Sequence, residues 1–74
     1  MPIQVVMDRN GDSRYFFEAT DMASLADAQA RFNDLTKRGF RAVARGKDGQ
    51  AGRVLPNFDN EAEETLFIPP LVGG

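Results

Sequence analysis

Two glycines, Gly73 and Gly74, close the sequence after the apolar pair Leu71-Val72. Glycine has no Cβ, so other backbones can approach it closely and a narrow enzyme channel can admit it. This ending is typical of proteins whose own terminal carboxylate is the reactive group. It predicts that Gly74 is an acyl donor and that Gly73 provides clearance. A Gly-Gly pair also arises by chance or as a frayed end, but the residues before it argue against fraying.

The residues before the glycines, Pro69, Pro70, Leu71 and Val72, have the properties of an exposed stalk. The two prolines fix φ and favour an extended, unpaired backbone, which lowers the entropy lost when a tail enters an enzyme. Leu71 and Val72 then offer apolar side chains to the channel walls. The alternative is that they fold back onto the domain. We expect the stalk, because a Pro-Pro pair does not support normal strand pairing.

The remaining side chains offer little for catalysis. The chain has no Cys and no His, which excludes thiol nucleophiles, imidazole bases and nearly every structural zinc site. Glu61, Glu63 and Glu64 lie close in sequence, but a short acidic run is usually a solvated turn or strand entry. A chain of 74 residues has no room for a deep cleft beside a core. We therefore expect no catalytic residue, no metal ligand and no enzyme activity.

The charge balance and the hydropathy bear on partners and location. A net charge of −2 gives no general attraction to nucleic acid. No apolar run approaches the roughly 18 residues of a membrane span, and Met1-Pro2-Ile3 does not begin a signal peptide. We expect a cytoplasmic protein that binds neither nucleic acid nor membrane. A cluster of basic residues lies in the middle of the chain: Lys37, Arg38, Arg41, Arg45, Lys47 and Arg53. One interpretation is a docking face for an acidic partner. The alternative for Lys37 and Arg38 is that they lie at a helix C-terminus, where their charge suits the helix dipole.

Two runs of strand-forming residues, 3–7 and 14–18, flank Asn10-Gly11 and predict an N-terminal hairpin. An amphipathic helix follows, in which Thr20, Asp21 or Ser24 caps the start. Its apolar stripe is Met22, Leu25, Ala28, Phe32 and Leu35. The end of the helix is marked by Lys37, Arg38, Gly39 and Phe40, with the aromatic ring folding back onto Leu35. Three shorter strands are expected after it, at residues 40–45, 53–55 and 65–68.

The register of the hairpin decides which side chains face the core. Direct pairing across a two-residue turn would place Met7 beside Arg14. A loop longer by one residue aligns Val5 with Phe17 and Met7 with Tyr15, which gives one apolar face. We prefer this second register.

The predicted order of hairpin, helix, strand, short strand and strand, with a Gly-Gly tail, resembles the β-grasp family of ubiquitin, ubiquitin-like modifiers and small sulfur carriers. This likeness implies an α+β fold in which a mixed four- or five-stranded sheet packs on one helix. The domain would span residues 1–68, and residues 69–74 would form the extended tail.

The tail carries a more specific likeness. Its pattern, Phe67-x-Pro69-Pro70-Leu71-x-Gly73-Gly74, is similar to the Phe-x-Pro-Pro-Val-x-Gly-Gly ending of the small subunit of molybdopterin synthase. Sulfur carriers of that type usually have a Gly-Asp-Glu turn before the last strand, where this chain reads Asn60-Glu61-Ala62-Glu63-Glu64-Thr65. The joint at residues 35–42 also differs. These departures favour a bacterial ubiquitin-like protein of the kind found beside activating, conjugating and deubiquitinase-like genes.

For such a modifier, the resemblance implies that an activating enzyme adenylates Gly74 and that the glycine is then transferred to a target amine. The partners would include the activating enzyme, a conjugating enzyme, a deconjugating protease and the target protein, in a bacterial conjugation pathway for which antiviral defence is one candidate role. ATP is used by the activating enzyme, so no cofactor is expected on this chain. Pro69, Pro70, Leu71 and Val72 would be the segment that the activating enzyme or the protease recognises.

Two other functions remain open. The first is a sulfur carrier with a thiocarboxylate at Gly74, acting in a molybdopterin or thiolation pathway. The second is a non-catalytic binding or assembly module in which the two glycines are incidental. A modifier would form isopeptide-linked adducts on other proteins, whereas a carrier would gain a sulfur atom in place of an oxygen.

A surface patch is the last expectation. The preferred hairpin register leaves Val6 and Phe16 apolar and pointing away from the core. In a β-grasp sheet the first and last strands are central neighbours, so Phe67 would join them in one apolar patch. The resemblance implies that such a face binds activating enzymes, receptors or further copies of the chain. The alternative is a different register, in which Phe16 belongs to the core.

Overall fold

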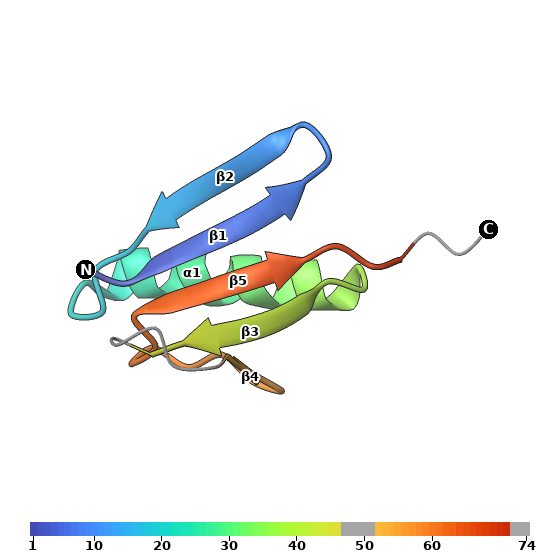
Figure 1. Ribbon diagram of the computed structural model, residues 1–74. Helices are drawn as coiled ribbons and strands as arrows, with labels where there is room; N and C mark the ends of the chain where they lie inside the picture. Colours follow the sequence, from blue (N-terminus) through green and yellow to red (C-terminus); the bar gives the residue numbers. More distant parts are fainter. Residues whose placement is uncertain (47–51, 72–74) are drawn as a thin grey trace.

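Five strands and one helix form the part of the chain that the computed structural model describes, residues 1–46 and 52–71 (Figure 1). The elements are β1 (Ile3–Asp8), β2 (Gly11–Phe16), α1 (Met22–Lys37), β3 (Arg41–Arg45), β4 (Arg53–Val54) and β5 (Glu64–Ile68). The strand order is β2-β1-β5-β3-β4, with β1 and β5 parallel and the other neighbouring pairs antiparallel. The predicted α+β class, one helix packed on a mixed sheet, is confirmed. The arrangement is compatible with a β-grasp.

The hairpin register differs from the one predicted. Asp8 pairs with Gly11, so the turn consists of Arg9 and Asn10 alone, and Val5 lies opposite Arg14. The preferred alignment of Val5 with Phe17 is therefore wrong. Gly11 has a φ of 122° and is the first residue of β2, so the glycine follows the turn instead of forming its centre. The turn consequently lies earlier in the sequence than the prediction placed it.

This register turns alternate residues of β1 toward the helix. Gln4 is fully buried there, and its Nε2 donates a hydrogen bond to the carbonyl oxygen of Ala28 at 2.9 Å. Its Oε1 accepts one from Nη1 of Arg31, also at 2.9 Å. Because a buried amide is costly without partners, these two bonds explain why a polar residue occupies a core position of the sheet. They also join β1 to the middle of α1.

The helix begins and ends near the predicted residues. Asp21 is the N-cap and accepts a hydrogen bond from the backbone N–H of Ala23. At the other end Gly39 adopts a φ of 97°, and the N–H of Phe40 donates to the carbonyl of Leu35 at 2.9 Å. Of the predicted stripe, Ala28, Phe32 and Leu35 are buried. Met22, in contrast, is 86% exposed, because it begins the helix.

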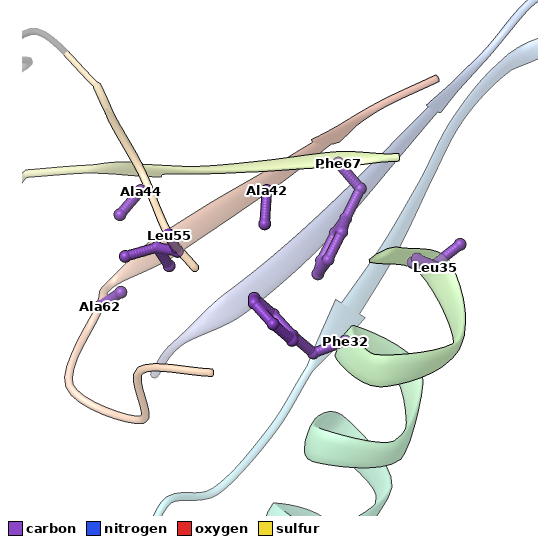
Figure 2. Close-up of a cluster of buried hydrophobic side chains, with 7 residues drawn as sticks. All are labelled: Phe32, Leu35, Ala42, Ala44, Leu55, Ala62 and Phe67. Atoms are coloured by element: carbon purple, nitrogen blue, oxygen red, sulfur yellow. The ribbon is translucent and has the colours of Figure 1, made fainter. Parts of the chain in front are cut away.

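Aromatic rings fill the space between α1 and the sheet. Phe67 of β5 is fully buried, and its ring meets that of Phe32 edge-to-face at 5.8 Å between centroids. Phe58 continues the series at 5.9 Å from Phe32 and 5.8 Å from Phe17. Each such pair contributes about 0.5–1.5 kcal/mol beyond the area that it buries. Figure 2 shows the buried cluster that surrounds Phe67, formed by Phe32, Leu35, Ala42, Ala44, Leu55, Ala62 and Phe67.

Replacing Gly39 by Ala is expected to lower the free energy of unfolding by about 1–2 kcal/mol, because a left-handed backbone costs an L-residue roughly that much. Space is not the reason, since a methyl group at Gly39 would lie 3.4 Å from Cβ of Pro70, an ordinary contact. Gly39→Asn should lose less, because asparagine tolerates this conformation better. Urea unfolding of the three proteins measures both differences. Equal stability of the Ala variant and the unsubstituted protein would contradict the expectation.

Candidate functional site

The exposed stalk begins where β5 ends. Pairing between β5 and β3 stops at Ile68, which lies opposite Arg41. Pro69, Pro70 and Leu71 are exposed, and the side chain of Leu71 is almost completely in solvent, with 99% of its surface accessible. Figure 1 shows residues 69–71, which follow β5, continuing away from the sheet. Leu71 therefore does not fold back onto the domain, as the stalk prediction required.

Gly73 and Gly74, the predicted clearance and acyl-donor residues, lie outside the described residues, and so does Val72. Their roles stay predictions. The structure describes the residues that precede them, which are the central strand β5, the Pro69-Pro70 pair and the exposed Leu71.

A groove of about 450 Å³ lies at the base of the stalk, lined by Gly39, Arg41, Ile68, Pro69, Pro70 and Leu71. On one side of it the ring of Pro70 packs against Gly39, just after the end of α1. The end of α1 thus lies beside the base of the stalk. Sequence reasoning assigned Gly39 only to the helix end and Arg41 only to a basic cluster. Strand pairing is the signal that connects Arg41 to the stalk, because Arg41 lies opposite Ile68, the last residue of β5. Gly39 lies two residues before Arg41 in the sequence.

The predicted partner patch of Val6, Phe16 and Phe67 is not formed. Val6 packs against the buried cluster and Phe67 is fully buried, so both face the helix. Only Phe16 points outward as predicted, with 62% of its surface exposed. The cause is the register: Phe16 lies opposite Ile3, which is on the other side of β1 from Val6.

The face of the sheet without the helix has a different apolar set. Alternation along each strand places its members on that face, and the two edge residues Phe16 and Val54 are more than half exposed. The set consists of Ile3, Val5, Met7, Phe16, Val43, Val54, Leu66 and Ile68. We call it the open apolar face, although Val5 in its centre is itself buried. The alternation of β5, with Thr65 and Phe67 inside, would have identified it.

The basic residues of the middle of the chain are largely paired with acids. Arg38 lies 3.3 Å from Asp34, Arg45 lies 3.4 Å from Glu64, and Arg53 lies 2.9 Å from Asp59. Lys37 occupies the last turn of α1, where its charge suits the helix dipole. Lys47 lies outside the described residues. Arg41, beside the stalk, is the member of the set that lines a groove next to the predicted reactive tail.

A second hollow, of about 240 Å³, is lined by charged residues including Arg45, Arg53, Asp59, Glu61 and Glu63. The backbone N–H of Glu61, followed by the Arg53 guanidinium, holds the pKa of Asp59 below its ordinary value of 3.8. A general base works best with a pKa near the operating pH, so this carboxylate is poorly suited to that role. Its bonds to Glu61 and Arg53, both 2.9 Å long, instead organise the chain between β4 and β5. In residues 1–46 and 52–71, no group of three or more acidic, His or Cys side chains is placed to hold a metal ion.

Comparisons with protein-family models, with curated proteins and with solved structures gave no match to this chain. Within the described ranges, no helix is both long enough and apolar enough to cross a membrane.

The lowered pKa of Asp59 predicts a pH dependence of stability. Because the folded-state pKa is below the unfolded one, the bonds of the Asp59 carboxylate to the backbone N–H of Glu61 and to Arg53 stabilise the fold above pH 3.8, and this contribution is lost as the pH falls through the folded value. Asp59→Asn should therefore be less stable than the unsubstituted protein at neutral pH and approach it in acid. Urea unfolding at about pH 7 and about pH 2 tests this. Glu61→Gln, which keeps the backbone N–H that binds Asp59, is the matched control, and an equal pH effect in both variants would refute the assignment.

Proposed function

We propose that this chain is a ubiquitin-like protein modifier of the β-grasp type, whose Gly74 is adenylated by an activating enzyme and then transferred to an amine of a target protein. The observation that carries the proposal is the exposed Pro69-Pro70-Leu71 segment, which leaves a central strand and precedes Gly73-Gly74. A reactive tail has to stand clear of its own domain in order to enter another protein, and this segment does so.

The arrangement of the domain supports the same proposal. The elements are a hairpin, one helix and three further strands. In the sheet, the first and last strands of the chain are parallel neighbours at the centre, as a β-grasp requires. The hollow lined by Arg45, Arg53, Asp59, Glu61 and Glu63 contains a carboxylate with a lowered pKa. These features fit a protein that other enzymes act upon.

The chemistry needs only one group from this chain. The carboxylate of Gly74 attacks the α-phosphate of ATP, pyrophosphate leaves, and an acyl adenylate forms on the partner enzyme. A target amine then attacks the acyl carbon and AMP leaves; alternatively a thiol of a partner enzyme displaces AMP first, and the amine then displaces that thiol from the thioester. The thiol must come from a partner, because this chain has no Cys. The proposal holds whether Gly74 ends the natural chain or is exposed by a protease.

Loss of Gly73 and Gly74 is expected to abolish conjugation. The tagged chain ending at Gly74, and the same chain ending at Val72, would be expressed in the native host, or together with the genes that flank its own. Gel analysis and intact mass then follow. The full chain should form adducts on other proteins that resist reductant, and the shortened chain should form none.

Other outcomes of that experiment favour the other functions. A mass gain of about 16 Da on the free protein, from sulfur replacing oxygen, without adducts would indicate a sulfur carrier, which the Phe67-x-Pro69-Pro70 pattern also fits. Identical behaviour of the two chains would indicate a binding module. If the modifier forms chains with itself, the linkage must be at Lys37, Lys47 or the N-terminus, since these are the amines of the chain.

Leu71→Glu is expected to reduce adduct formation strongly and to leave stability unchanged. The side chain is 99% exposed, so its replacement costs the fold nothing, whereas a carboxylate in an apolar enzyme channel carries a desolvation penalty. Met22→Glu is the matched control, because it introduces the same charge at a position that is 86% exposed but at the start of α1. Adduct yield and thermal midpoint should be measured for both. Equal conjugation of the two variants would remove the stalk from the proposal.

A further inference from the structure

The edge strand β2 is the least protected part of the sheet. It is one of the two outermost strands and the longer of them, it lies beside β1 alone, and every residue from Gly11 to Phe16 is exposed. Figure 1 shows no described segment along its outer side. Edge strands are commonly shielded by proline, lysine or a covering segment, and β2 contains neither of those residues. Its outer backbone groups are therefore available to another strand.

The hydrogen-bond phase of the hairpin identifies those groups. The N–H of Phe17 donates to the carbonyl of Pro2 at 3.1 Å, so the backbone N–H and C=O groups of Phe17 point toward β1. Because antiparallel pairs alternate between bonded and non-bonded positions, the backbone N–H and C=O groups of Tyr15 and Ser13 also point toward β1. The N–H and C=O groups of Asp12, Arg14 and Phe16 must then point outward. The side chains of these three residues lie on the same side of the sheet as the open apolar face.

We propose that β2 is a self-association edge, at which the β2 strands of two copies of this chain pair antiparallel about a two-fold axis through Ser13. In that register Asp12 of each copy lies opposite Arg14 of the other. Both residues turn their backbone groups outward, so each Asp12–Arg14 pair exchanges both backbone hydrogen bonds and also matches opposite charges. The two sheets become one continuous sheet with a closed, two-fold symmetry.

Charge and phase select this register over its neighbours. Shifting the pairing by one residue would place Arg14 opposite Ser13, whose backbone groups already face β1, so the ladder could not form. Moving the axis to Arg14 again places outward-facing backbone groups opposite each other. It also sets Arg14 of one chain directly opposite Arg14 of the other, and like charges directly opposite are destabilising. An axis at Tyr15 restores the phase too, but it shortens the overlap and leaves Asp12 without a partner. The axis through Ser13 is the one that pairs both charges.

This inference is independent of the conjugation proposal. It uses β2, whereas the predicted reactive tail leaves from β5, and β1 lies between them. The edge strand can therefore associate whether or not Gly74 reacts, and either conclusion can fail without the other.

The test is sedimentation velocity of the chain from micromolar to millimolar concentration, together with three variants. The unsubstituted chain should show a reversible dimer. Arg14→Asp places acids opposite acids at both positions and should raise the dissociation constant about tenfold or more. The double variant Asp12→Arg with Arg14→Asp reverses both charges, keeps them complementary, and should restore the dissociation constant to within about threefold.

Arg14→Pro supplies the backbone arm of the experiment. Proline removes the outward N–H of residue 14 while the bonds between β1 and β2 stay in place, as proline on an edge strand permits. The variant should keep the circular dichroism of the fold and lose the dimer. If Arg14→Pro does not fold, the charge-reversal pair still decides the question.

A monomer at all concentrations would overturn the proposal, and so would a dimer that none of the Arg14 variants weakens. In the second case Phe16→Ser and Val54→Ser would locate the contact on the open apolar face. Specific capture of a foreign extended peptide by β2, with no self-association, would also overturn it.

Discussion

The burial of Phe67 is the constraint on which the rest of the structure depends. This ring is the largest side chain with no exposed surface, and it lies between β1, β3 and α1 in the centre of the sheet. Its inward orientation fixes the alternation of β5, so that Thr65 is inside while Leu66 and Ile68 are outside. Burying a Phe side chain contributes about 1.5–3 kcal/mol, a large fraction of the stability of a domain this small. A one-residue slip would lose that contribution and reverse every residue of the strand.

The same constraint sets the position of the stalk. The ring of Phe67 is held against Phe32, one residue before β5 ends at Ile68, and Pro69, which has no N–H to donate, begins the unpaired segment. Gly39 then receives Pro70 at the helix terminus. The glycine is required by its positive φ, which ends α1 and places the following residues beside the base of the stalk. Core packing, helix capping and the direction of the tail are connected through these few residues.

The sequence predicted well whatever depends on local patterns. The helix and its end at Gly39 follow from apolar spacing and from glycine chemistry, and the existence of every strand was predicted with ends that differ by a few residues. The register of the hairpin was not, because apolar residues occupy both faces of β1 and Gln4 occupies a core position. A buried glutamine is invisible to a hydrophobic pattern, since its partners, Ala28 and Arg31, come from the helix. The error in the surface patch followed directly, whereas the stalk depended only on two prolines and was predicted correctly as far as Leu71.

The exposure of Leu71 has a thermodynamic consequence for any partner of the tail. A leucine held in water keeps its hydration shell, and its transfer to an apolar channel contributes about 1.5–3 kcal/mol. Because the Leu71 side chain buries almost no surface in the free domain, its transfer free energy does not stabilise the fold and would contribute only when a partner binds the tail. The prolines before it reduce the entropy that ordering the tail would otherwise cost. Association through this segment should carry a negative heat-capacity change, the mark of apolar surface leaving water, although the tail is only a few residues long.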